Sequence, residues 1–174
     1  MHLKQVAQSI VSRFHSQTNY NPLILRIFRD CNGTWHVITI VPVKHYDVMK
    51  GLLFEQFPHG TCWKTDIRTS SVSVNPFTEV HLESPNPPSS LDDQHLIEID
   101  NAISKLVLCY KKMEATKIKM LAARIAQKGV STQYKISVQF KKDMENYQQA
   151  FKHYKSLTSV EVKPPLEIPE ASDL

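Results

Sequence analysis

The longest regular pattern in the chain is an apolar repeat that comes after a stretch rich in proline and serine. Its members recur at three- and four-residue steps, which place side chains on one side of an α-helix. The repeat comprises Leu96, Ile99, Ile103, Leu106, Tyr110 and Met113, then shifts by one residue to Ile118, Leu121 and Ile125. With Gly129 as the C′ residue, it predicts one helix of about 35 residues, about 50 Å long.

The segment after Gly129 fits two patterns. Tyr134, Ile136, Val138 and Phe140 alternate as in a strand, so residues 132–141 are ambiguous. A helical repeat also begins at Ile136 and continues for five turns, through Phe140, Met144, Tyr147, Phe151 and Tyr154. The longer pattern favours a second helix, which makes residues 92–158 an antiparallel helical hairpin.

The N-terminal half has shorter elements. Apolar spacing predicts helices over residues 2–16 and 44–57, and β-rich arms flank a tight turn at Asp30 to Thr34, where Asn32-Gly33 favours positive φ. Pro42 is expected to end the second arm near Val41. Further short strands are expected over 62–68, 71–74 and 77–83.

These elements define the expected organisation. We expect an α+β fold in which an N-terminal helix and a small antiparallel sheet (1–83) precede a long C-terminal antiparallel helical hairpin (92–158). SPNPPSS predicts a linker over 84–91, because proline interrupts helices and ladders. Residues 159–174 are expected to form a disordered tail.

Composition and charge limit the classes of protein to which the chain can belong. The net charge of the 174 residues is +4, and the excess of Lys and Arg lies in the C-terminal half. Three cysteines without paired spacing favour a reducing, cytoplasmic location over a disulfide framework. We see no signal peptide and no membrane-spanning run, and we expect no cofactor, because Walker and dinucleotide-binding loops are absent.

The octapeptide QFPHGTCW (56–63) resembles the local signature of papain-type cysteine proteases, with Gln56 as the oxyanion donor and Cys62 as the nucleophile. The chain departs from that family in the residues after Trp63, and it ends fewer than 130 residues after Cys62, where the family places its histidine and asparagine. A cysteine-dependent hydrolase is therefore the third hypothesis. We favour Trp63 as a core residue that begins a strand, after a turn at His59-Gly60.

Cysteine and histidine also suggest a metal site. Cys31 and His36 flank the predicted hairpin turn, and His59 and Cys62 come after the second helix as H-x-x-C. If the loops meet, the four side chains have the composition of a tetrahedral zinc shell. The sequence leaves this question open.

The helical hairpin carries the leading functional hypothesis. A helix of about 50 Å exceeds a small α+β domain, which is about 25 Å across, so its apolar seam needs another cover. We expect a non-enzymatic adaptor, chaperone or assembly subunit that contacts another protein chain or a second copy. The candidate contact residues are Tyr110, Met113, Tyr147, Phe151 and Tyr154, each of which also suits packing between the two helices.

The alternative is binding of RNA or DNA by a lysine-rich face. Lysine suits phosphate contacts, although arginine is preferred for bidentate recognition. The candidate residues are Lys111, Lys112, Lys119, Lys141 and Lys142.

Overall fold

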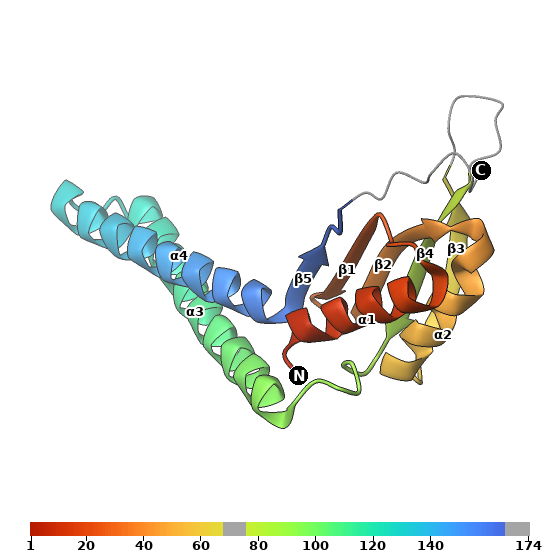
Figure 1. Cartoon of the computed structure of the whole chain (residues 1–174). Coiled ribbons are helices and arrows are strands. Elements are labelled where there is room, and N and C mark those ends of the chain that lie inside the picture. Colours follow the sequence, from red (N-terminus) through yellow and green to blue (C-terminus); the bar gives the residue numbers. More distant parts are fainter. Residues whose placement is uncertain (68–75, 166–174) are drawn as a thin grey trace. The chain divides into compact units, whose positions relative to one another are not determined.

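A computed structural model describes residues 1–67 and 76–165 of the chain. The predicted strand over 71–74 lies outside the described residues. The chain divides into two compact units (Figure 1): an α+β unit made of Met1–Asp92 and the segment from Thr158, and a helical unit, Asp93–Leu157. The α+β fold with a C-terminal helical hairpin is confirmed.

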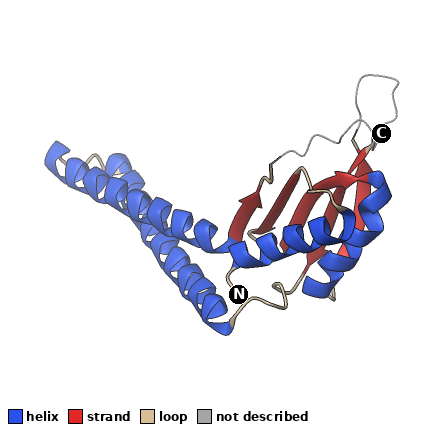
Figure 2. Ribbon diagram, viewed as in Figure 1, coloured by secondary structure: helices blue, strands red, loops and turns tan. Residues whose placement is uncertain are grey.

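The α+β unit is built on an antiparallel five-stranded sheet. The strands are β1 (Ile24–Arg29), β2 (Trp35–Pro42), β3 (Thr61–Asp66), β4 (Phe77–Ser84) and β5 (Ser159–Val162), in the order β3-β4-β2-β1-β5. Helices α1 (Leu3–Thr18) and α2 (Tyr46–Gln56) lie on one face of this sheet (Figure 2), and the short 3-10 helix η1 (Val43–His45) precedes α2. Its core therefore lies between one layer of helices and one layer of strands.

Alternating side chains of the central strands form that core. In β4, Val80 and Leu82 are fully buried, as the sequence predicted, while Glu79 and His81 point to the opposite face. The helices contribute side chains to this core from one face of α1, from α2 and from the residue that follows α2: Val6, Ile10, Phe14, Met49, Leu53 and Phe57.

The turn between β1 and β2 confirms the predicted hairpin. Gly33 adopts a φ of 84°, in the left-handed region that favours glycine. The Asp30 carboxylate accepts hydrogen bonds from the backbone N–H groups of Asn32 and Thr34, both at 2.9 Å. The turn is therefore fixed by a side chain as well as by the backbone.

Two expectations about the ends of this unit need correction. The prediction of a disordered tail was wrong for Ser159–Val162, because these residues form β5, which pairs antiparallel with β1. The segment expected to be a linker packs on the α+β unit: Leu91 is buried, and Ser90 donates a hydrogen bond to the Gln56 side chain at 2.6 Å.

The helical unit consists of α3 (Asp93–Ile125) and α4 (Val130–Thr158). Residues 132–141 lie in α4, so the helical interpretation is confirmed. The predicted role of Gly129 was wrong, because the left-handed C′ residue of α3 is Gln127, with a φ of 50°. Lys128 and Gln127 donate backbone hydrogen bonds to Ala123 and Arg124, which is the Schellman arrangement.

Small and polar side chains fill much of the interface between α3 and α4. Ala102, Ala123 and Ala150 are buried there, together with a hydrogen-bonded pair, Thr116 and Asp143. The Thr116 hydroxyl donates to Asp143 Oδ2 at 2.6 Å, and Gln139 donates to the other carboxylate oxygen at 2.8 Å. Many of the bulky apolar side chains of these helices are instead exposed.

Candidate functional site

The helical unit exposes an apolar stripe along α3. Val107, Tyr110, Ile118, Leu121 and Ile125 recur at helical spacing, which puts them on one side of the helix, and each is at least 45% exposed. We call these five residues the α3 stripe. They occupy about 27 Å of helix at 1.5 Å per residue.

Aromatic side chains of α4 adjoin this stripe. The ring centroids of Tyr110 and Tyr147 are 5.8 Å apart, and those of Tyr147 and Phe151 are 6.3 Å apart. Both separations suit offset or tilted aromatic pairs. The aromatic surface therefore crosses from one helix to the other.

The five predicted contact residues differ in their exposure to solvent. Tyr110 and Phe151 are exposed, and Met113 and Tyr147 are half-buried. Tyr154 is only 8% exposed, so its side chain belongs to the interior. The apolar repeat in the sequence includes every member of the α3 stripe except Val107. It could not show which side chains are exposed, because the same steps serve a buried seam and an exposed one; the available signal was the shift of the repeat after Met113.

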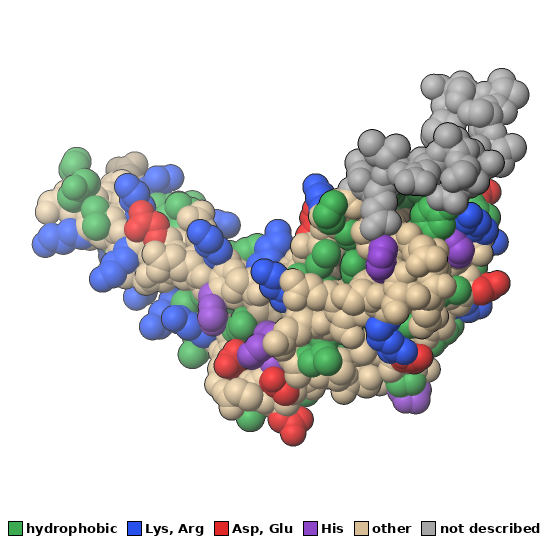
Figure 3. Space-filling model, in the orientation of Figure 1, with side chains coloured by type: hydrophobic (Ala, Val, Ile, Leu, Met, Phe, Trp, Pro, Cys, Tyr) green, Lys and Arg blue, Asp and Glu red, His purple; other side chains and the backbone are tan. Residues whose placement is uncertain are grey.

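The five candidate lysines are all exposed, but they do not share one side of a helix. On α3, Lys111 and Lys112 are adjacent and so point about 100° apart, and Lys119 lies on the side of Lys112. Lys141 and Lys142 diverge in the same way on α4. Figure 3 shows Lys and Arg side chains spread along the hairpin with hydrophobic ones between them.

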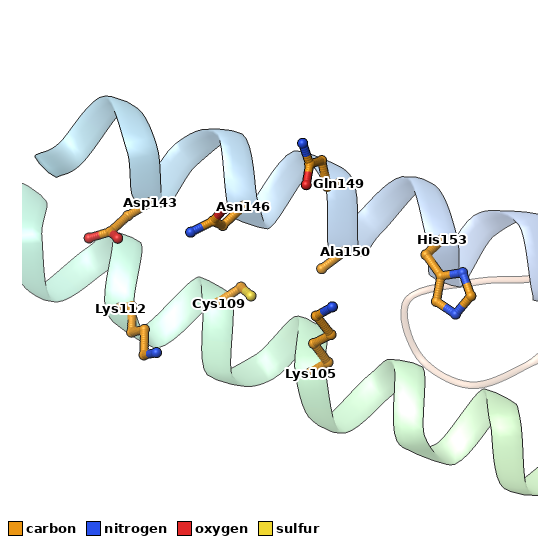
Figure 4. A pocket seen from close by; sticks show the side chains of 8 residues that line it. All are labelled: Lys105, Cys109, Lys112, Asp143, Asn146, Gln149, Ala150 and His153. Atoms are coloured by element: carbon orange, nitrogen blue, oxygen red, sulfur yellow. The ribbon is translucent and has the colours of Figure 1, made fainter. Parts of the chain in front are cut away.

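A small groove lies between α3 and α4 (Figure 4), lined by Lys105, Cys109, Lys112, Asp143, Asn146, Gln149, Ala150 and His153. Its volume is about 220 Å³. Small-molecule pockets typically have about 300–1,000 Å³ and mainly apolar walls. This groove is smaller, and most of the residues that line it are polar or charged, so we do not assign it a small ligand.

The papain-like octapeptide does not build a nucleophile. Cys62 lies in strand β3, not at a helix N-terminus, and burial raises the pKa of its thiol. The Tyr46 hydroxyl is 3.9 Å from the sulfur. Gln56 binds Ser90, so its side chain has a structural role. The hydrolase hypothesis therefore gains no support.

Trp63 lies near the start of strand β3, as predicted, but its predicted position in the core was wrong. Its side chain is 38% exposed and packs against His81, with ring centroids 4.4 Å apart. Strand β3 lies at the sheet edge, and Trp63 points to the face opposite α1 and α2.

The predicted cysteine and histidine set does not converge. In the sheet register, Cys62 is opposite Leu82, whereas His36 is opposite Glu83. Neighbouring residues of a strand point to opposite faces, so Cys62 lies on the helix-covered face and His36 on the other. The question that the sequence left open is therefore answered against a site with these four ligands, although His36 has other titratable neighbours.

Comparison of the chain with protein-family models, curated proteins and solved structures finds no match. Within the described ranges, 1–67 and 76–165, no helix combines the length and apolarity needed to cross a bilayer.

Proposed function

We propose that the protein is a non-enzymatic adaptor or assembly subunit whose α3 stripe binds an acidic amphipathic helix of another protein. The observation that carries this proposal is the exposure of the stripe, which continues onto the aromatic rings of α4. An exposed apolar face with helical spacing is suited to helix-to-helix packing.

Charge favours a partner of opposite sign. In residues 93–157, Lys and Arg outnumber Asp and Glu twelve to six. Lys111 lies four residues after Val107, and Lys117 lies four residues before Leu121, so lysines flank the stripe. Opposite charges speed encounter and fix register, whereas a second copy brings the same positive excess. An acidic helix therefore fits this surface better than self-association does.

Composition fits a cytoplasmic location for this role. Cys31, Cys62 and Cys109 are all free, as expected in a reducing compartment. We accordingly place the partner in the cytoplasm as well.

Site-specific photo-crosslinking tests the proposal. A benzoylphenylalanine at Tyr110 is compared with one at Leu108, which is 60% exposed but lies on a different side of α3. We expect crosslinks from position 110 to an acidic peptide with apolar residues at helical spacing, and few from position 108. Equal yields at both positions, or crosslinks only to another copy of this chain, contradict the proposal.

The alternative function, binding of RNA or DNA, is tested in parallel. Anisotropy titrations with labelled RNA and DNA at two salt concentrations measure phosphate-driven binding, which weakens steeply as salt rises. Tight, salt-sensitive binding that is lost in a Lys111→Glu, Lys112→Glu, Lys119→Glu variant would favour the alternative. Weak binding that does not depend on these lysines agrees with a protein partner.

A further inference from the structure

The face of the sheet opposite α1 and α2 brings together three potential metal ligands. His36 lies on β2, and His81 and Glu83 lie on the neighbouring strand β4. His36 is directly across from Glu83, and His81 is two residues along the same strand, so all three side chains leave the same face. One ligand atom of each lies within 4.8 Å of the other two.

Of the two contacts of His36 Nδ1 with these side chains, one is within hydrogen-bond distance and the other is not. His36 Nδ1 is 3.2 Å from His81 Nε2 and 3.7 Å from Glu83 Oε1. The second separation is too long for a hydrogen bond. Two ligands about 2.0–2.1 Å from a tetrahedral zinc ion are about 3.4 Å apart, so both separations are close to an edge of that shell.

A carboxylate behind His36 fixes the ring for metal binding. Asp30 Oδ2 is 2.8 Å from His36 Nε2. If Nε2 carries the proton and donates it to Asp30, the lone pair of Nδ1 faces His81 and Glu83. Metal-binding histidines characteristically pair their second nitrogen with a carboxylate in this way. Asp30 is itself held by the backbone of Asn32 and Thr34.

Aromatic packing holds both imidazoles in place. Phe28 stacks on His36, with centroids 4.9 Å apart and an interplanar angle of 12°. Trp63 packs on His81 from strand β3. The ligands and their packing partners therefore sit on four adjoining strands of a rigid sheet, which limits the reorganisation that binding requires.

We propose that His36, His81 and Glu83 form a site for a divalent transition metal, Zn²⁺, with Asp30 as the orienting partner of His36. Two imidazoles and one carboxylate are a ligand set that zinc accepts, and a tetrahedral shell then keeps its fourth position for water or an external donor. His81 binds through Nε2 and carries its proton on Nδ1. This site belongs to the α+β unit and does not depend on the function proposed for the hairpin.

Metal titration of the untagged 174-residue chain tests the site. Zn²⁺ binding is measured by calorimetry after chelator treatment, and Co²⁺ is used as a probe because its visible absorption reports coordination geometry. His81→Gln and Glu83→Gln remove ligands, and Asp30→Asn removes the orienting carboxylate. The matched control is His59→Gln, which changes an exposed histidine outside the cluster. Circular dichroism confirms that each variant is folded.

We expect one ion per chain with tetrahedral Co²⁺ absorption. His81→Gln and Glu83→Gln should lower the affinity at least about tenfold, and Asp30→Asn about 10–100-fold, the range for partners of metal-binding histidines. His59→Gln should leave the affinity unchanged. Absence of saturable one-to-one binding overturns the proposal. Equal Zn²⁺ affinity in the His81→Gln and His59→Gln variants also overturns the proposal, because other histidines would then bind the ion.

Discussion

The buried pair of Thr116 and Asp143 shows how a single hydrogen bond can fix two helices. Both residues are 8% exposed, and the hydroxyl donates to the carboxylate across the α3–α4 interface. A buried charge that loses a partner keeps its desolvation cost. We therefore expect the pair to favour the register that keeps this hydrogen bond over registers that would break it.

Thr116→Val should destabilise the chain by about 1–3 kcal/mol, because it removes one donor from a buried carboxylate. Urea unfolding followed by circular dichroism measures the change. The double variant Thr116→Val, Asp143→Leu should recover most of the loss, since no charge then remains buried. Thr132→Val, at an exposed position of α4, is the control. An equal effect of Thr116→Val and Thr132→Val contradicts this account.

His45 links the stability of the α+β unit to pH. Its ring lies 6.2 Å from the Phe14 ring and 5.2 Å from the Tyr20 ring, and its Nε2 has no hydrogen-bond partner among the described residues. Burial, and to a smaller extent the charge of Lys44, lower its pKa from 6.5. The unfolded chain therefore takes up a proton at a pH where the folded chain does not.

Stability should consequently fall as the pH drops below about 6.5, by at most about 1.4 kcal/mol per pH unit for this one proton. His45→Leu should flatten that slope, and His59→Leu, at an exposed turn, should not. The free energy of unfolding at several pH values between 7.5 and 5 provides the measurement. The same slope in the wild type and in His45→Leu would refute the assignment.

At the scale of the elements, the C-terminal end of α3 depends on a glutamine whose backbone lies in the left-handed region that favours glycine. Gln127 has positive φ at the C′ position, where glycine avoids the steric cost of Cβ. Gly129, in contrast, has open space around its Cα and lies at the start of α4.

Gln127→Gly should therefore stabilise the hairpin by about 1 kcal/mol. Gly129→Ala should not stabilise it, because Gly129 lies at the N-cap of α4, where glycine is preferred over alanine. Thermal and urea unfolding of both variants provide the comparison. A lack of stabilisation by Gln127→Gly would contradict the assignment of the C′ position to residue 127.

Local patterns predicted most of the helices and strands, because their signals lie within a few residues. The turn at Gly33 and the alternation of Val80 and Leu82 are of this kind. Strand β5 was missed because four residues carry little periodicity, and its partner β1 lies far away in the sequence. Hydrogen bonds between distant segments were missed for the same reason, as with Gln56 and Ser90.

The sites were harder to predict than the elements. His81 and Glu83 alternate with the apolar residues of their strand, but their position beside His36 depends on the pairing of β2 with β4. Trp63 lies in an edge strand, where composition does not decide which face a side chain takes. Which side chains come together therefore depends on how the strands pair, and the sequence does not show that pairing directly.

At the scale of the whole molecule, the helical unit interrupts the α+β unit in the sequence. Its two ends lie together, because His95 Nε2 is 2.9 Å from the backbone oxygen of Leu157. The sheet then receives β5 from beyond the interruption. This arrangement resembles the insertion of one domain into another, which is tolerated where chain ends are close.

Replacing residues 94–157 with a short Gly/Ser linker should therefore leave a folded α+β unit with a complete sheet. Residues 1–92 alone should be less stable, because the edge of β1 loses β5. Size-exclusion chromatography and thermal unfolding of the two chains test this. Failure of the linked chain to unfold cooperatively would show that the hairpin is required for the sheet.

The most direct measurement of the central claim is the affinity of the full chain for the acidic helix recovered by crosslinking at position 110. Tyr110→Ser should weaken that affinity at least about tenfold, as loss of an interface aromatic typically does. Leu108→Ser should leave it unchanged. Equal affinities in the two variants would contradict recognition by the α3 stripe.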